Sequence, residues 1–342
     1  MHRVGPWNRV IPQTLLRNSP RPAAGVGVKA GKLPRGTVTP SFLLDPDDDR
    51  LMAGTMLAHT KQYRVEGCIG EGGMGWVYKA WDPVLERPVA LKVMKPEVPE
   101  SERDRFRREA IWGARFCHPA IARVFDLVGV PGQGISWFVM EYLPGRDLGT
   151  LIERARKRDT AIPLRLVIDV FRQILSALQY SHDCKVVHRD VKPENMFVTR
   201  DPNTRFVTSK LLDFGVALDR SQPPTSPERH LVGDPRYIAP EQTEHGRRID
   251  GRADVYAAGM SLYEALCNRH PFADLHAFHG QGLLQAQRER KPAPVSTYLS
   301  DEISSPLACG LDVVVAKAIA KDPDQRFESA RDMLEALLDV AS

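Results

Sequence analysis

Five short, mainly apolar stretches in the first half of the chain predict strands. The five stretches are residues 63–69, 76–80, 89–94, 121–130 and 136–141. Between the third and the fourth, Ser101 is followed three residues later by Asp104, a spacing typical of a helix start with a capping box. The pattern therefore predicts a small lobe with five strands and one helix.

Beyond residue 145 the apolar positions follow a helical period instead. Those in the first helical segment are Val167, Val170, Phe171, Ile174, Leu175 and Leu178. Residues 254–267 are apolar nearly all round, which predicts a helix buried at the centre of a lobe. Residues 311–320 and 330–338, the latter capped by Ser329, predict closing helices. We therefore expect an α+β protein in which a cleft between a sheet lobe and a larger helical lobe holds the ligand.

Residues 1–60 show neither helical nor alternating periodicity. The first forty hold six prolines, seven lysines or arginines and no acidic residue, so they cannot bury enough apolar surface to offset the entropy of ordering. We therefore expect a disordered basic arm over residues 1–60. Three interpretations stay open: a plain arm or a translation start at Met52 or Met56, a tail that binds a partner, and a targeting peptide.

The net charge of +4 also belongs to this arm. Residues 1–50 hold eight lysines or arginines and four aspartates, whereas the remainder holds 39 charges of each sign and gives no reason to expect nucleic acid. Five scattered cysteines lack metal-ligand or redox spacing, which predicts reduced thiols and a cytoplasmic location. No stretch approaches the roughly 18 apolar residues of a membrane span.

One loop, residues 187–195, carries the groups that phosphoryl transfer requires. It places Asp190, Lys192 and Asn195 within six positions. The carboxylate can orient a hydroxyl and accept its proton, the ammonium can neutralise phosphate charge, and the carboxamide can hold a metal ion. Asp213 follows Asn195 by eighteen residues and opens an Asp-Phe-Gly turn with a second carboxylate suited to a metal.

A glycine-rich run, residues 70–75, and a strand that contains Lys92 precede this loop. In this order, the four elements resemble the eukaryotic-like serine/threonine protein kinase family over about residues 62–338. The resemblance implies a two-lobed protein kinase fold. Its implied parts are a five-stranded antiparallel sheet lobe with one helix (residues 62–140), a hinge (141–143) and a mainly helical lobe (144–340), within a domain over residues 61–342.

The resemblance assigns ATP to the cleft beneath the glycine run, where backbone N–H groups can approach the phosphates without obstruction by Cβ atoms. The residues it assigns to the nucleotide there are Ile69, Gly70, Glu71, Gly72, Gly73, Met74, Gly75, Trp76 and Val77. Ala90 and Phe197 would sandwich the adenine ring, and the backbones of Glu141 and Leu143 would bind its edge. Asp147 would bind a ribose hydroxyl or a basic substrate side chain, unless it only stabilises a helix N-terminus.

The resemblance also implies the catalytic roles. Lys92 would bind the α- and β-phosphates, held by an ion pair with Glu109 seventeen residues later. Asp190 would orient the acceptor hydroxyl, and Lys192 is the choice of serine/threonine-specific members. Mg²⁺ would be ligated through hard oxygen atoms by Asn195 and Asp213.

The C-terminal half separates protein kinases from small-molecule kinases of similar fold. Glu241 ends an Ala-Pro-Glu segment and should form a buried pair with Arg326, and Asp254 should hold the backbone of the catalytic loop. Arg189 is typical of members that a phosphate on the activation segment activates. The candidate sites for this autophosphorylation are Ser221, Thr225 and Ser226.

Two positions depart from the family pattern. Gly113 stands where a bulky apolar residue usually stacks on Phe214, which predicts a gap in that column. The side chains placed to fill it are Trp112 and Phe116. Asp234 replaces a threonine that contacts the catalytic Asp and Lys. Because a second carboxylate would repel Asp190, we expect Lys192 to pair with Asp234 and basal activity to be low; in the alternative, Asp234 turns outward.

These observations predict an ATP- and Mg²⁺-dependent serine/threonine kinase that phosphorylates protein substrates. The alternative is a pseudokinase that binds nucleotide and serves as a scaffold, but Lys92, Asp190, Asn195 and Asp213 are all present, which favours the enzyme. A small-molecule kinase is disfavoured by Lys192 and the activation segment. The glycine run resembles that of bacterial members. Receptor-type bacterial members carry a membrane span after the kinase domain. This sequence ends before such a span could occur, so we expect a free-standing kinase.

Overall fold

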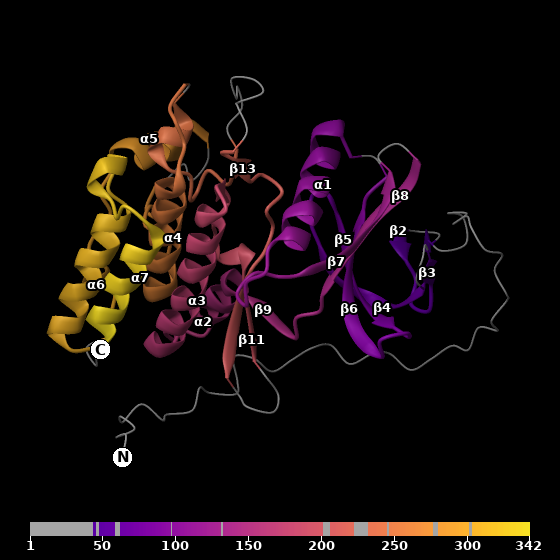
Figure 1. The fold of residues 1–342 in the computed structure, drawn as a ribbon. Coiled ribbons are helices and arrows are strands. Elements are labelled where there is room, and N and C mark those ends of the chain that lie inside the picture. Colours follow the sequence, from indigo (N-terminus) through magenta and orange to yellow (C-terminus); the bar gives the residue numbers. More distant parts are fainter. Residues whose placement is uncertain are drawn as a thin grey trace, which may run out of the picture.

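The computed structural model shows a strand-rich lobe from the first half of the chain beside a larger helical lobe from the second (Figure 1). The structure describes residues 44–45, 48–58, 62–96, 98–130, 133–200, 206–221, 232–244, 246–275, 280–300 and 303–342. The expected α+β architecture is confirmed.

One antiparallel sheet of six strands forms the N-terminal lobe, one strand more than predicted. In spatial order its strands are β3 (Met56–Ala58), β4 (Gln62–Glu71), β5 (Gly75–Asp82), β6 (Arg87–Met94), β8 (Gln133–Glu141) and β7 (Val124–Val130). The period of two sends neighbouring residues of β8 to opposite faces. Trp137 packs in a core on one face, while Phe138 meets Phe106 of helix α1 (Glu100–Arg115) on the other, with ring centroids 4.9 Å apart.

Helix α1 begins before the expected capping residue. Pro99 occupies the N-cap position without a side-chain hydrogen bond, and Ser101 lies inside the first turn. Glu100 and Glu102 place negative charge at the positive end of the helix dipole, which stabilises the start without a capping box.

The sixth strand, β3, comes from the segment that we expected to be disordered. It pairs with β4, and the hairpin of β1 (Leu44–Asp45) and β2 (Asp48–Leu51) precedes it. The side chains of Leu57 and Leu51 are 0% and 5% exposed, and the Leu51 N–H donates to the Tyr78 hydroxyl at 2.9 Å. The structure therefore moves the start of the folded region upstream of the predicted boundary at residue 60. Our expectations for residues 1–43 lie outside the described residues.

Replacing Leu57 tests whether this upstream segment is part of the core. We expect Leu57→Ala to lower the free energy of unfolding by about 2–5 kcal/mol, because it leaves a cavity in a closely packed sheet core. Leu85→Ala is the matched control, since Leu85 is 51% exposed on the hairpin between β5 and β6. Urea unfolding should show a loss within about 0.5 kcal/mol for the control; equal losses would place Leu57 outside the core.

The C-terminal lobe consists of six helices and two small sheets within the described part of the chain. Its helices are α2 (Leu148–Lys157), α3 (Leu164–Asp183), α4 (Gly251–Cys267), α5 (Gly280–Glu289), α6 (Ser305–Ala318) and α7 (Ala330–Ala341). Its strands are β9 (Gly145–Asp147), β10 (Val186–Val187), β11 (Met196–Arg200), β12 (Val207–Leu211) and β13 (Leu218–Asp219). Helix α4 is buried nearly all round, and the Ser329 hydroxyl caps α7 by accepting from the Asp332 N–H at 3.1 Å, both as predicted.

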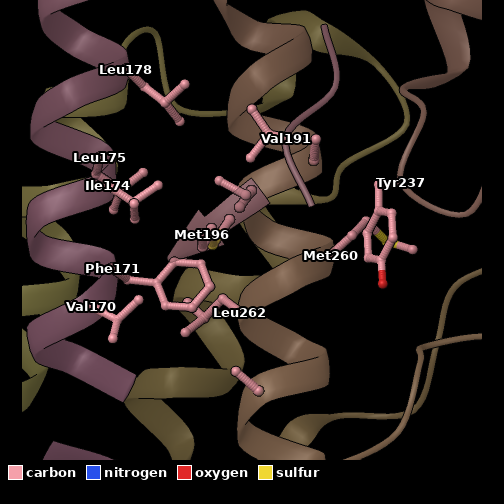
Figure 2. Close-up of a cluster of buried hydrophobic side chains, with 14 of the residues drawn as sticks. Val170, Phe171, Ile174, Leu175, Leu178, Val191, Met196, Tyr237, Met260 and Leu262 are labelled. Atoms are coloured by element: carbon pink, nitrogen blue, oxygen red, sulfur yellow. The ribbon is translucent and has the colours of Figure 1, made fainter. Parts of the chain in front are cut away.

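The core between α3 and α4 holds the catalytic loop in place. Figure 2 shows Val191 and Met196, near the two ends of the segment that contains Lys192 and Asn195, among the apolar side chains of these helices. Burial of both flanks fixes the polar residues between them relative to the helical lobe. Among the helices that the structure describes, none combines the length and the apolar character needed to cross a bilayer.

Candidate active site

An ion pair joins the sheet to helix α1. The Nζ atom of Lys92 on β6 lies 2.7 and 2.5 Å from the two carboxylate oxygens of Glu109 on α1. Both side chains are largely buried, and burial raises the pKa of Glu109 to about 7 although Lys92 opposes the shift. Burial works against the Lys92 ammonium, but Glu109 and Asp213 outweigh it and raise the pKa of Lys92. The predicted pair is therefore formed and holds the helix against the sheet.

The catalytic loop brings Asp190, Lys192 and Asn195 into direct contact. Lys192 Nζ lies 2.8 Å from Asp190 Oδ2, and Asn195 Nδ2 donates to the Asp190 carbonyl at 2.8 Å and to Oδ2 at 3.1 Å. The buried Asp254 carboxylate accepts from the backbone N–H groups of His188 and Arg189, each at 2.8 Å. The expected anchoring of the loop by Asp254 is confirmed, since it holds the two backbone N–H groups that precede Asp190.

Asp213 lies near the Lys92–Glu109 pair and interacts electrostatically with both of its members. Burial raises its pKa, but Lys92 and the N–H of Gly215, which donates at 3.0 Å, outweigh burial and hold the pKa of Asp213 below its usual value. Asp213 is thus ionised at neutral pH, and the Asn195 amide nitrogen is used by Asp190, which leaves the carboxamide oxygen as the available acceptor. Both donors are hard oxygens and fit Mg²⁺.

The glycine run connects β4 to β5. The Gly72 N–H donates to the Gly75 carbonyl at 2.8 Å, and a Cβ at Gly75 would lie 2.2 Å from the Val93 carbonyl oxygen, so only glycine fits there. Met74 and Trp76 are 8% and 7% exposed and pack in the cores of the lobe. Their predicted contact with nucleotide is thus limited to the backbone.

The remaining side chains of the run differ in their surroundings. Glu71 projects to the surface, where Arg50 and Lys95 bind its carboxylate at 2.9 and 2.8 Å. Ile69 is 52% exposed. Val77 lies opposite Lys92 in the sheet. A Cβ atom at Gly70 or Gly72 would meet no atom closer than 3.7 Å, and one at Gly73 would meet none within 4 Å, so the space beside these three residues is open.

The predicted adenine contacts lie around the connection between the lobes. Ala90 pairs with Met140 in the sheet, and Phe197 of β11 lies opposite Asp147 of β9. The Glu141 carboxylate binds Lys210 at 2.9 Å, and Leu143 follows two residues later in the same connection. Both oxygens of Asp147 accept from Thr150, its N–H and its hydroxyl each at 2.7 Å. Asp147 therefore serves as the cap of α2, the alternative that the sequence left open.

Phe116 fills the gap beside Phe214. The two ring centroids lie 4.9 Å apart, and Trp112 stacks on the far side of Phe116 at 5.4 Å. A Cβ at Gly113 would lie 2.5 Å from a methyl carbon of Val124, so the space that a larger side chain would need is occupied by the sheet.

The activation segment ends in two ion pairs. Arg326 binds Glu241 through two contacts of 2.7 Å, and both are buried, as predicted. Asp234 binds Arg236 at 2.7 Å and pairs with Lys192 at 3.9 Å, so the expected Asp234–Lys192 pair is present but long, and Lys192 stays 2.8 Å from Asp190. Among the candidate phosphorylation sites, the Ser221 hydroxyl contacts Asp219 at 2.5 Å, and Thr225 and Ser226 lie outside the described residues.

Sequence reasoning missed Arg236 and a cavity beside it. The cavity, of about 450 Å³, lies next to the catalytic loop between α2 and α4, and Glu194, Arg236 and Glu264 line it. The signal was an arginine two residues after an unusual aspartate, a spacing at which the two side chains can meet in a turn.

The comparisons with known proteins agree with this geometry. The model of the protein kinase domain family matches residues 63–338. A probable serine/threonine-protein kinase of Corynebacterium efficiens is 36% identical over 80% of this chain and 40% of its own length. The serine/threonine-protein kinase PksC of Streptomyces coelicolor is 35% identical over 85% of this chain and 50% of its own length. This chain thus spans about half or less of these two relatives.

A solved structure shows the same fold. The kinase domain of Mycobacterium tuberculosis PknI, crystallised as a double mutant, matches 86% of this chain and all of its own with a TM-score of 0.63 and 29% identity. The predicted two-lobed protein kinase fold is confirmed. Together with the family match, this shows that the chain belongs to the protein kinase domain family, as a member similar to bacterial serine/threonine-protein kinases.

Proposed function

We propose that this protein is an ATP- and Mg²⁺-dependent kinase that phosphorylates serine and threonine hydroxyls of other proteins in the cytoplasm. The observation that carries the proposal is that two separate constellations are both assembled. Lys92 is paired with Glu109 in one lobe, and Asp190 is in contact with Lys192 and Asn195 in the other. A pseudokinase need not keep both.

The roles follow from charge and position. Asp190 would orient the acceptor hydroxyl and take its proton, because it is an ionisable carboxylate held by the loop backbone. Lys92 and Lys192 would stabilise the charge that develops on the transferred phosphoryl group. Asn195 and Asp213 would hold Mg²⁺, which neutralises phosphate charge when bound. We further propose that the catalytic unit includes residues 48–58, which precede the matched family domain.

Removal of Mg²⁺ by a chelator distinguishes an effect on phosphoryl transfer from an effect on folding. Within the described residues, no three His, Cys, Asp or Glu side chains converge on a metal position, so Mg²⁺ would depend on phosphate oxygens as well as on Asn195 and Asp213. We expect EDTA to reduce transfer of radiolabelled γ-phosphate from ATP to a generic basic protein to background and to leave the melting temperature of the nucleotide-free protein unchanged.

Two controls decide between the candidate functions. Restoring excess Mg²⁺ should restore transfer, and ATP labelled at the α-phosphate should label no protein. Binding of nucleotide without γ-phosphate transfer at any Mg²⁺ concentration would identify a pseudokinase instead.

A further inference from the structure

Arg236 holds the unusual aspartate of the activation segment. Its Nε and Nη2 atoms donate to the two carboxylate oxygens of Asp234 at 3.0 and 2.7 Å, a bidentate geometry that fixes both groups. The same guanidinium reaches Glu194 in the catalytic loop at 2.8 Å. One side chain therefore joins the end of the activation segment to the loop that carries Asp190.

Two buried polar side chains, those of Gln287 and His270, hold the backbone of Arg236 in place. Its carbonyl oxygen accepts from Gln287 Nε2 at 2.5 Å and from His270 Nε2 at 2.8 Å. Gln287 is fully buried, and burial lowers the pKa of His270 to about 4, so the ring is neutral at pH 7. Because His270 Nδ1 accepts from the Phe272 N–H, its proton lies on Nε2 and points at Arg236. These contacts fix the backbone position from which the Arg236 guanidinium reaches Asp234.

Asp234 lies near two cations and contacts Arg236 much more closely than Lys192. Lys192 Nζ lies 3.9 Å from Asp234 but 2.8 Å from Asp190, while the backbone N–H of Asp234 donates to Asp190 Oδ1 at 3.0 Å. Asp234 is 18% exposed, and Lys192 is the other cation near it. Without Arg236, an ionised Asp234 would turn to Lys192 and draw it from Asp190.

We propose that Arg236 is a positioning residue: it serves as the counter-ion of Asp234, which leaves Lys192 on Asp190 and available to the transferred phosphate. The proposal rests on the proposed kinase function. In this arrangement the Asp234 carboxylate is harmless to catalysis, and its backbone N–H supports the catalytic carboxylate.

A second-site rescue tests the proposal. Arg236→Ala should lower kcat about tenfold with an unchanged KM for ATP, since Lys192 is displaced rather than removed. Adding Asp234→Asn to that variant should return kcat to within about twofold of the wild type, because the carboxamide does not attract Lys192. The kcat of Arg236→Lys should lie between that of Arg236→Ala and that of the double variant. A merely structural role of Arg236 predicts no rescue, and a double variant as slow as Arg236→Ala would overturn the proposal.

A readout that does not need activity separates this proposal from the proposed function. The rate of acetylation of Lys192 by acetic anhydride, followed by mass spectrometry, should fall in Arg236→Ala and recover in the double variant. Arg247→Ala is the control, since Arg247 forms an exposed pair with Glu244 at 2.8 Å. If the wild type transfers no phosphate but labelling follows this pattern, the kinase function fails and the positioning role holds; if transfer is normal and labelling is insensitive to Arg236, the positioning role is wrong.

Discussion

Asp190→Asn is expected to reduce kcat for phosphoryl transfer by about a hundredfold to ten-thousandfold, the usual contribution of a general base. Asp190 Oδ1 accepts from the Asp234 N–H, and Oδ2 accepts from Asn195 and contacts Lys192. An amide offers one acceptor oxygen in place of two and takes no proton at neutral pH. The loss should therefore fall on kcat, and the dissociation constant for Mg-ATP should change little.

Steady-state kinetics on a generic protein substrate, together with titration by a fluorescent nucleotide, measure the two quantities separately. Glu335→Gln is the control, a change of the same chemistry on an exposed residue of α7. Because Asp190 lies in a loop anchored independently by Asp254, the melting temperature should stay close to that of the wild type. Transfer by Asp190→Asn at a wild-type rate would reject Asp190 as the base.

Lys92→Met is expected to lower transfer by on the order of a hundredfold or more, since it removes a preorganised positive charge from the phosphates. The change should also extend the pH range over which folding depends on the protonation of Glu109. Lys92 lowers the pKa of Glu109, which burial already raises to about 7, so without Lys92 the folded-state pKa lies higher still. The unfolded value is near 4.5.

The sign follows from proton linkage. Between the two pKa values the folded variant holds a proton that the unfolded chain has lost, so stability falls as pH rises through that window, by about 1.4 kcal/mol per pH unit. Melting temperatures between pH 5 and 8 should fall steadily for Lys92→Met. They should be flat for Lys92→Met combined with Glu109→Gln. A flat profile for the single variant would show that Glu109 finds another cation.

The two lobes and most elements were predictable because their apolar residues follow the period of the structure that they form. The strand that carries Lys92 and the buried helix α4 are examples, since both are mainly apolar in sequence and buried nearly all round in the structure. The catalytic groups were predictable because phosphoryl transfer needs a few residue types at short spacing. Their contacts follow once Val191 and Met196 enter the core.

Other features depend on contacts between distant parts of the chain, which a local pattern does not contain. The three residues of β3 form a strand only because β4 offers an edge and a core for Leu57. Gly113 looked like a gap, but Val124 of β7 already fills the space. From the sequence, Asp234 was expected to compete with Asp190 for Lys192. Its pairing with Arg236 could not be predicted, because that pairing depends on the backbone position of Arg236, which Gln287 holds.

The short strand β3 also determines which backbone groups lie at one edge of the sheet. The matched family domain begins at residue 63, inside β4, so β3 lies just outside it. Without residues 56–58, the N–H and C=O groups of β4 would form an open sheet edge beside the apolar surface that Leu57 covers. Such an edge is a template for pairing with another chain and promotes aggregation. We expect β3 to limit such pairing, because it covers residues 62–64 of β4 and, as an edge strand of three residues, offers a short template itself.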